Sequence, residues 1–159
     1  MKIGVVYIIL FSLLCHSCKE RSLDEVDKVI DYSTQIAEIE EAVWQLHTAD
    51  TSLNAQGVLD LMWPESSMLV DGNRLSFNEI STGSKQFMSG LTLFHTVWED
   101  LRVIRLSENT AISSFIFNDS IVNKEGAIIQ SKGPNTFIWE KRDDQWKIIF
   151  GDADHYAVE

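Results

Sequence analysis

The sequence predicts an α+β domain in which helices come first and pack on one face of a curved antiparallel sheet. Between residues 30 and 46, apolar positions recur at the spacing of one helical face. From about residue 93 the pattern changes to four long strand-like runs joined by short turns, which is typical of an antiparallel meander. A chain of 159 residues is long enough for one such domain with a hydrophobic core.

The N-terminus resembles a bacterial lipoprotein signal peptide. Residues 1–17 carry one basic residue, Lys2, and then about a dozen mostly apolar residues, too few to span a bilayer of about 30 Å. Because Ser17 precedes Cys18, we expect Cys18 to be lipidated, residues 18–30 to form a tether and residues 31–159 to form the domain. The alternative is a secretory peptide whose Cys15 and Cys18 are free or joined in a disulfide.

The lipidated form would be anchored to a membrane of the bacterial cell envelope, on its periplasmic or surface side, without spanning it. The start Ser17-Cys18-Lys19-Glu20 also resembles the export signals of Bacteroidetes surface lipoproteins.

Three helices are expected in the first half of the domain. The first has an inward stripe made of Tyr32, Ile36, Ile39, Val43 and Leu46. A second, over residues 53–62, has cap residues at 50–52 and is stopped by Pro64. A short strand at 66–70 leads into a turn at 71–73. A capping box formed by Ser76 and Glu79 then begins a third helix, which Gly83 is expected to interrupt.

The second half is expected to form four strands, at residues 94–106, 110–122, 127–140 and 145–156. The last two flank a polar turn at 141–145 and read as a hairpin that closes the sheet. Gly133 and Pro134 fall inside the third run, where a proline requires a sheet edge, a bend or a bulge.

The composition excludes several function classes. The chain has 13 basic and 24 acidic residues, a net charge of −11, so phosphate backbones and anionic headgroups would repel it, and we expect no nucleic-acid partner. There is no glycine-rich phosphate loop and no nucleophile elbow, so no cofactor is expected. His47, His95, Asp152 and His155 lack the short spacings of metal motifs, so no metal site is predicted.

The order of these elements resembles the NTF2-like superfamily, in particular its SnoaL-like or DUF4440 group, over residues 32–157. The resemblance is carried by the first helix with Ile36-Ala37-Glu38-Ile39 and Trp44, by Asp71-Gly72, by Gly83, and by Trp146-Lys147-Ile148 followed by His155. It implies a cone open at one end, with a pocket lined by both layers, and homodimers formed through the outer face of the sheet. The superfamily contains both enzymes and non-catalytic binding modules, so the fold does not settle the function.

The residues expected to line the pocket are Trp44, His47, His95, Phe115, Trp139, Asp152 and His155. For proton transfer, His95 and His155 are the first candidates because a neutral imidazole accepts and returns a proton near pH 7. Asp152 could orient an imidazole. Asp71 falls near the aspartate base of the ketosteroid isomerases, although a turn alone also explains it, and the tyrosine of those enzymes has no counterpart here.

Three functions remain open from the sequence. The first is an envelope protein that binds a small, largely apolar or aromatic molecule in its cone. The second is an enzyme of isomerase, cyclase or dehydratase type that performs acid–base chemistry without a cofactor. The third is a dimeric protein-interaction module, which would have a filled cavity and an exposed apolar patch.

Overall fold

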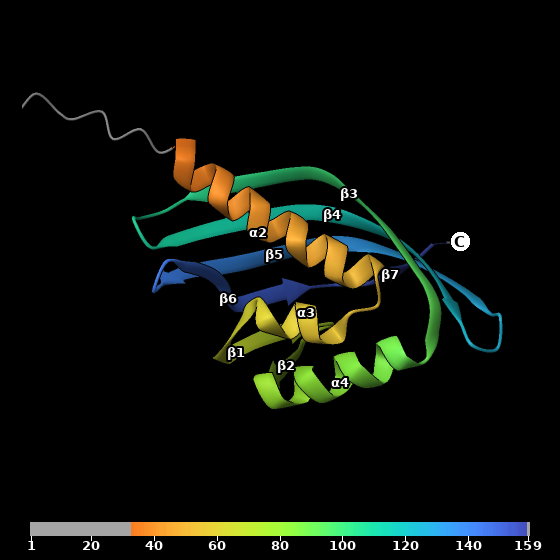
Figure 1. The fold of residues 1–159 in the computed structure, drawn as a ribbon. Coiled ribbons are helices and arrows are strands. Elements are labelled where there is room, and N and C mark those ends of the chain that lie inside the picture. The colour runs from red at the N-terminus through yellow and green to blue at the C-terminus, as the bar shows by residue number, and fades with distance from the viewer. Residues whose placement is uncertain (1–32, 159) are drawn as a thin grey trace, which may run out of the picture. The chain divides into compact units, whose positions relative to one another are not determined.

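The computed structural model describes residues 33–158, which form three helices and a seven-stranded sheet (Figure 1). The helices are α2 (Ser33–Thr51), α3 (Ala55–Asp60) and α4 (Phe77–Ser89). Within these residues, no helix is long and apolar enough to cross a membrane. The predicted signal peptide, the tether and the lipidation site at Cys18 lie outside the described residues.

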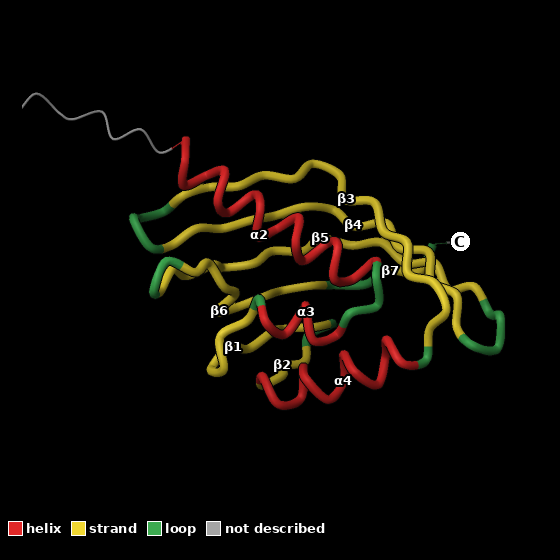
Figure 2. Tube along the Cα trace, in the orientation of Figure 1, coloured by secondary structure: helices red, strands yellow, loops and turns green. Residues whose placement is uncertain are grey.

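The strands form one mixed sheet in the order β2-β1-β6-β5-β4-β3, and the short β7 pairs with β5 (Figure 2). Their bounds are β1 (Met62–Val70), β2 (Asn73–Ser76), β3 (Leu91–Arg105), β4 (Thr110–Asn123), β5 (Ile128–Arg142), β6 (Gln145–Ala153) and β7 (Tyr156–Ala157). Strands β3 to β6 form the predicted antiparallel meander. Strand β1 joins the far side of β6 in parallel, a pairing that the sequence pattern did not reveal.

Helix α2 runs across one face of the sheet (Figure 1). The predicted stripe is confirmed at Ile39, Val43 and Leu46, which are buried. Ala42 and Ala49 are buried with them, and the helix extends beyond Leu46, the last residue of the predicted stripe, to Thr51. The α+β class and the helix-on-sheet arrangement are therefore as expected.

The second helix differs from its prediction at both ends. Because α2 continues through residues 50–51, the N-cap of α3 is Asn54, whose Oδ1 accepts the backbone N–H of Gly57 at 3.0 Å. The helix ends at Asp60, and β1 begins at Met62. Pro64 therefore lies inside the first strand and does not terminate the helix.

The turn between β1 and β2 is confirmed, with positive φ angles of 50° at Asp71 and 78° at Gly72. The capping box is also confirmed, because a Glu79 carboxylate oxygen accepts the Ser76 backbone N–H at 2.8 Å and the Ser76 hydroxyl at 2.6 Å. The predicted interruption at Gly83 is wrong: α4 passes through it. One helical glycine costs only about 1 kcal/mol, which packing of the buried Ile80 and Met88 can offset.

The last predicted strand is divided into β6 and β7. Along β5, the pairing with β6 ends where Asn135 lies opposite Ala153. The pairing of β5 with β7 includes Lys132, which lies opposite Tyr156. The Gly133–Pro134 pair lies where β5 exchanges one partner for the other, and the Pro134 carbonyl accepts the Asp154 N–H at 3.3 Å. This accounts for a proline within a long strand, because a change of partner removes the need for its missing N–H.

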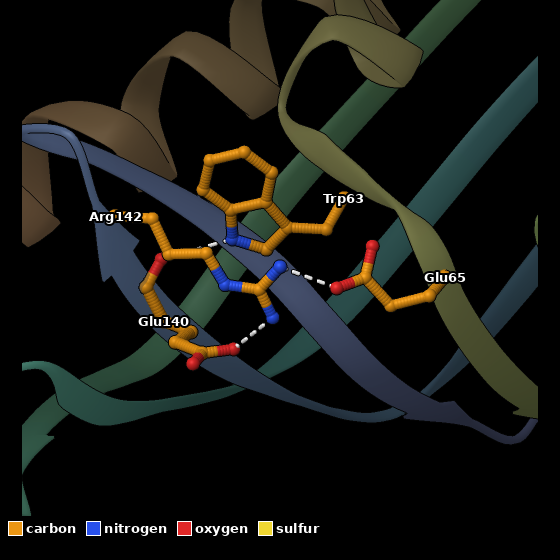
Figure 3. A network of polar contacts seen from close by, with 4 residues as sticks. All are labelled: Trp63, Glu65, Glu140 and Arg142. Atoms are coloured by element: carbon orange, nitrogen blue, oxygen red, sulfur yellow. Dashed lines mark hydrogen bonds and ion pairs between the residues drawn. The ribbon is translucent and has the colours of Figure 1, made fainter.

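A cluster of polar and aromatic side chains joins β1 to the end of β5 (Figure 3). The Arg142 guanidinium forms ion pairs with Glu65 and Glu140 and lies 4.8 Å from the centre of the Trp63 ring. The Trp63 indole N–H donates to the Glu140 backbone oxygen at 3.1 Å. Exposed ion pairs contribute little individually, so this cluster chiefly fixes the position of β1 beside the β5–β6 hairpin.

Candidate functional site

A cavity of about 390 Å³ is lined by residues of all three helices and of strands β1 to β6. Its aliphatic lining is Leu46, Val58, Met62, Met68, Val70, Leu75, Ile80, Ile148 and Ala153, and Gly83 of α4 also borders it. Its aromatic lining is Phe87, Phe94, Trp98, Phe115, Phe117 and Phe137. Its polar lining is Asp50, Glu79, Ser84, Thr96, Asp119, Asn135 and His155. A largely apolar enclosure with a few polar groups is the usual form of a small-molecule site.

The aromatic wall follows from strand alternation. In β4, Phe115 and Phe117 are buried and Ile116 between them is exposed, because successive side chains point to opposite faces of the sheet. Trp98 on β3 stacks on Phe115 with ring centres 3.9 Å apart and planes 16° apart. Phe137 on β5 continues the wall at 6.1 Å from Phe115.

Three buried side-chain oxygens of the lining have no hydrogen-bond partner among the described residues: Thr96 Oγ1, Asp119 Oδ1 and Asn135 Oδ1. Thr96 and Asp119 are directly opposite each other on β3 and β4, and Thr96 is only 4% exposed. Leaving a buried polar atom unsatisfied costs about 1–3 kcal/mol. A bound molecule with a suitably placed polar group would recover part of that free energy.

The cavity also contains two carboxyl groups with raised pKa values. The pKa of Asp50 rises from 3.8 to about 7, first because burial disfavours the carboxylate and second because Asp119 is a nearby like charge. Burial likewise raises the pKa of Asp119, although the Thr96 hydroxyl and the His155 ring partly oppose the rise. The hydroxyl is near enough to act on the carboxyl but lies outside the geometry of a hydrogen bond. The pair can therefore hold a proton near neutral pH.

At the turn between β1 and β2, Asp71 holds His155. An Asp71 carboxylate oxygen accepts the His155 backbone N–H at 2.7 Å and lies 3.1 Å from ring Nδ1. The backbone hydrogen bond is the main reason that the pKa of Asp71 is lowered. Because a carboxylate only accepts, Nδ1 donates, and Nε2 of a neutral His155 is left as an acceptor. The ring itself lines the cavity and lies 5.0 Å from Phe117.

Of the seven residues expected in the pocket, Phe115 and His155 line the cavity and the other five lie outside its lining. His95 is exposed, because it follows the inward Phe94 and precedes the inward Thr96 on β3. Asp152 lies between the buried Gly151 and Ala153 on β6 and faces the other way.

The remaining three belong to α2 and the core. Trp44 is 49% exposed and packs on the outer side of Trp98, with ring centres 6.3 Å apart. His47 Nε2 donates to the Thr96 backbone oxygen at 3.2 Å, so it supports the wall from outside. Trp139 is completely buried, and its indole N–H donates to Ser113 Oγ at 2.8 Å.

The two cavity-lining carboxyls, Asp50 and Asp119, were not predicted, although both carry a readable signal in the sequence. Asp119 has the same strand parity as Phe115 and Phe117, so it belongs to the inward face. Asp50 follows Leu46 by four positions on the apolar stripe of α2. An acidic residue that continues an apolar stripe is uncommon in a core and indicates a site.

Among residues 33–158, no group of three or more His, Cys, Asp or Glu side chains is arranged to hold a metal ion. Neither a protein-family model nor a curated protein matches the sequence. Solved structures do match.

A nuclear transport factor 2 (NTF2-like) superfamily protein from Salmonella enterica aligns over 80% of this chain and 93% of its own, with a TM-score of 0.68 and 16% identity. The domain has the NTF2-like fold. An NTF2-like protein from Cytophaga hutchinsonii aligns over 78% and 98% of the two chains, with a TM-score of 0.66 and 17% identity. An NTF2-like family protein from Streptomyces avermitilis, described as a candidate dehydratase, aligns over 79% and 99%, with a TM-score of 0.70 and 15% identity. These TM-scores establish the NTF2-like fold, and the low sequence identities leave the activity open.

Proposed function

We propose that this NTF2-like domain binds a small, largely apolar molecule in its cavity. The observation that carries the proposal is the combination of an apolar, aromatic-walled cavity of about 390 Å³ with three unpartnered buried oxygens in its lining. The apolar wall would bind the body of the molecule through the hydrophobic effect. The oxygens would bind its polar group and so fix its orientation. The alternative, a protein-interaction module, would have a cavity filled by side chains, and the open cavity weighs against that alternative.

Ligand-dependent stabilisation tests this proposal. The purified chain is melted with a library of sterols, aromatic polyketides, and small apolar acids, amines and neutral compounds. A specific ligand at a hundredfold excess over its Kd should raise the free energy of unfolding by about 2.7 kcal/mol. Trp98→Ala should remove the ligand-induced shift, because Trp98 lines the cavity. Trp44→Ala is the matched control, because Trp44 packs on the same ring from outside the lining. No saturating shift with any compound would contradict the proposal.

A second candidate function is proton transfer on the bound molecule, of isomerase, cyclase or dehydratase type. It is supported by the Asp50 pKa of about 7, because a general acid–base group works best when its pKa is near the working pH. Asp50 and Asp119 would exchange the proton, and Asp71 would hold the His155 ring in position. His95 faces away from the cavity and has no part in this scheme.

The test begins with the ligand found by stabilisation and measures its turnover. Asp119→Asn should abolish turnover while the ligand still raises the melting temperature, because the amide keeps the shape and loses the exchangeable proton. Asp152→Asn removes the same charge from the outward face of β6 and should leave turnover unchanged. A ligand that binds without chemical change would leave binding as the function.

We also propose the homodimer and the lipid anchor expected from the sequence. Exposed apolar side chains on the outward face of the meander would support a dimer, and they include Leu93, Val97, Ile104 and Ile116. Sedimentation of the purified chain tests the dimer. Metabolic labelling with a fatty acid, with Cys18→Ala as the control, tests the anchor.

A further inference from the structure

The charged groups around the cavity are strongly unbalanced. Its titratable lining residues are Asp50 on α2, Glu79 on α4, Asp119 on β4 and His155 after β6. Among the described residues, no lysine and no arginine lines the cavity. An anionic ligand would therefore meet carboxyl groups without a permanent cation to pair with, which is unfavourable in a site of low dielectric constant.

The unpartnered atoms indicate the same kind of ligand. Thr96 is 4% exposed and lines the cavity, and its hydroxyl oxygen has no partner in the described structure. One Asp119 carboxyl oxygen and the Asn135 amide oxygen are also buried without a hydrogen-bond partner among the described residues. The amide oxygen only accepts hydrogen bonds, the Asp119 carboxyl only accepts them when it is ionised, and a hydroxyl can also accept. The complementary ligand group is a donor or a positive charge.

The two partly buried carboxyls of the lining, Asp50 and Asp119, would also respond to a cation. Burial is the main reason that each is costly to ionise, and the nearby charge of Asp119 adds to the cost at Asp50. A positive charge between them would stabilise both carboxylates, whereas a negative charge would raise the cost further. The aromatic lining is compatible with this, because aromatic rings carry negative charge on their faces and tolerate a cation better than aliphatic walls do.

We propose that the ligand of this cavity is a hydrophobic cation, either an amine that is protonated at neutral pH or a quaternary ammonium compound. Its apolar body would lie along the aromatic wall, and its positive group would lie among Asp50, Thr96 and Asp119. The inference rests on the proposed binding function and adds the chemical class of the ligand.

Three probes of similar size separate charge from shape. Benzyltrimethylammonium is the cation, (2,2-dimethylpropyl)benzene is its neutral isostere with carbon in place of nitrogen, and phenylacetate is an anion. Their dissociation constants are measured at pH 8 on the full chain, in 0.15 M and in 0.5 M salt. The net charge of −11 attracts any cation weakly to the surface, and salt removes that contribution. We expect one saturable site, with the cation bound at least about tenfold tighter than its isostere, which corresponds to about 1.4 kcal/mol.

Two variants test whether the preference for the cation over its isostere arises inside the cavity. Asp119→Asn should bring the affinities of cation and isostere to within about twofold of each other, because it removes the charge at the head-group position. Asp152→Asn, with the same change in net charge on the outward face, should keep the tenfold preference. If Asp119→Asn does not fold, Asp50→Asn replaces it, because Asp50 is the other carboxyl of the pair.

The outcomes separate this inference from the proposed function. If the isostere binds as tightly as the cation, or phenylacetate binds better, the ligand is not a cation but the cavity still binds apolar molecules. If no probe binds, the cation inference is overturned, and the wider library then decides whether the cavity binds anything. An equal loss of preference in Asp119→Asn and Asp152→Asn would show that surface charge alone produced it.

Discussion

Replacing Asp50 with asparagine should change how the stability of this domain depends on pH. The substitution keeps the size of the side chain and removes its titration. In the native chain the pKa of Asp50 is about 7, against 3.8 for an unburied aspartate, mainly because burial disfavours the carboxylate. The folded state therefore binds the Asp50 proton more tightly than the unfolded state does.

The sign and size of the effect follow from linkage. Between pH 3.8 and about 7 the folded state carries more protons at Asp50 than the unfolded state, so the free energy of unfolding falls as pH rises through this window. At about 1.36 kcal/mol for each pH unit, the full loss is about 4 kcal/mol at most. At pH 5 about 1.6 kcal/mol of this loss has already occurred, and the larger part follows between pH 5 and about 7. The Asp50→Asn variant should therefore gain stability relative to the native chain steadily from pH 5 upward. By pH 8 the variant should be the more stable protein.

Other carboxyl groups change the stability of the domain in a different pH range. The pKa values of Glu38, Glu65, Asp71 and Glu79 are lowered by their hydrogen bonds, so they stabilise the fold above about pH 4.5 and lose that effect in acid. Their contribution is common to both proteins. The pKa of Asp119 is also raised, so Asp119 likewise lowers the free energy of unfolding as pH rises, and it does so in both proteins because the variant retains it.

Urea unfolding, followed by the fluorescence of the five tryptophans, measures this difference at pH 5, 6, 7 and 8. The two stability curves should separate as pH rises, with unchanged dependence on urea concentration. Curves that stay parallel over the whole range would refute the assignment of a raised pKa to Asp50. Asp152→Asn is the control, because its side chain faces away from the cavity.

Three further substitutions test the packing. Ser113→Ala should lower the free energy of unfolding by about 1–3 kcal/mol, because it leaves the buried Trp139 N–H without its acceptor; no change in urea unfolding would contradict this. Gly133→Ala should cost about 1–3 kcal/mol or more, because its Cβ would lie 1.6 Å from the Asp154 carbonyl oxygen; an undiminished melting temperature would be incompatible with that contact. Gly83→Ala should instead add about 1 kcal/mol, because nothing lies within 4 Å of the new Cβ and alanine favours helix; a loss would show unseen crowding.

Local patterns were enough to predict most of the fold. The stripe of Ile39, Val43 and Leu46, the Ser76–Glu79 capping box and the turns of the meander each depend on residues close in sequence. The parallel pairing of β1 with β6 depends on strands far apart in the chain, and periodicity does not report such pairings. The end of α2 and the start of α3 were misplaced because Asn54 and the residues at 50–52 are all plausible caps.

The candidate site was less predictable than the fold. Histidines and tryptophans were predicted in the pocket because of their residue type, but the direction of each side chain is set by strand parity and helix packing. His95 and Asp152 each lie one position away from an inward residue, and one position reverses the direction of a strand side chain. Strand parity places Asp119 on the inward face, but only the pairing of β3 with β4 brings it opposite Thr96.

The parallel pairing of β1 with β6 also determines the order in which the cavity can be assembled. Strand β1 is made early, and it pairs with the adjacent β2 on one side, but its partner on the other side is β6, far later in the chain. During synthesis, helix α2 can pack on β3 early, but the side of β1 that faces β6 must wait for the hairpin that carries β6 before it is covered. Contacts between distant parts of a chain slow folding and prolong the exposure of apolar surface. A chain truncated before β6 would leave this surface exposed and should be recognised by chaperones and proteases as incomplete.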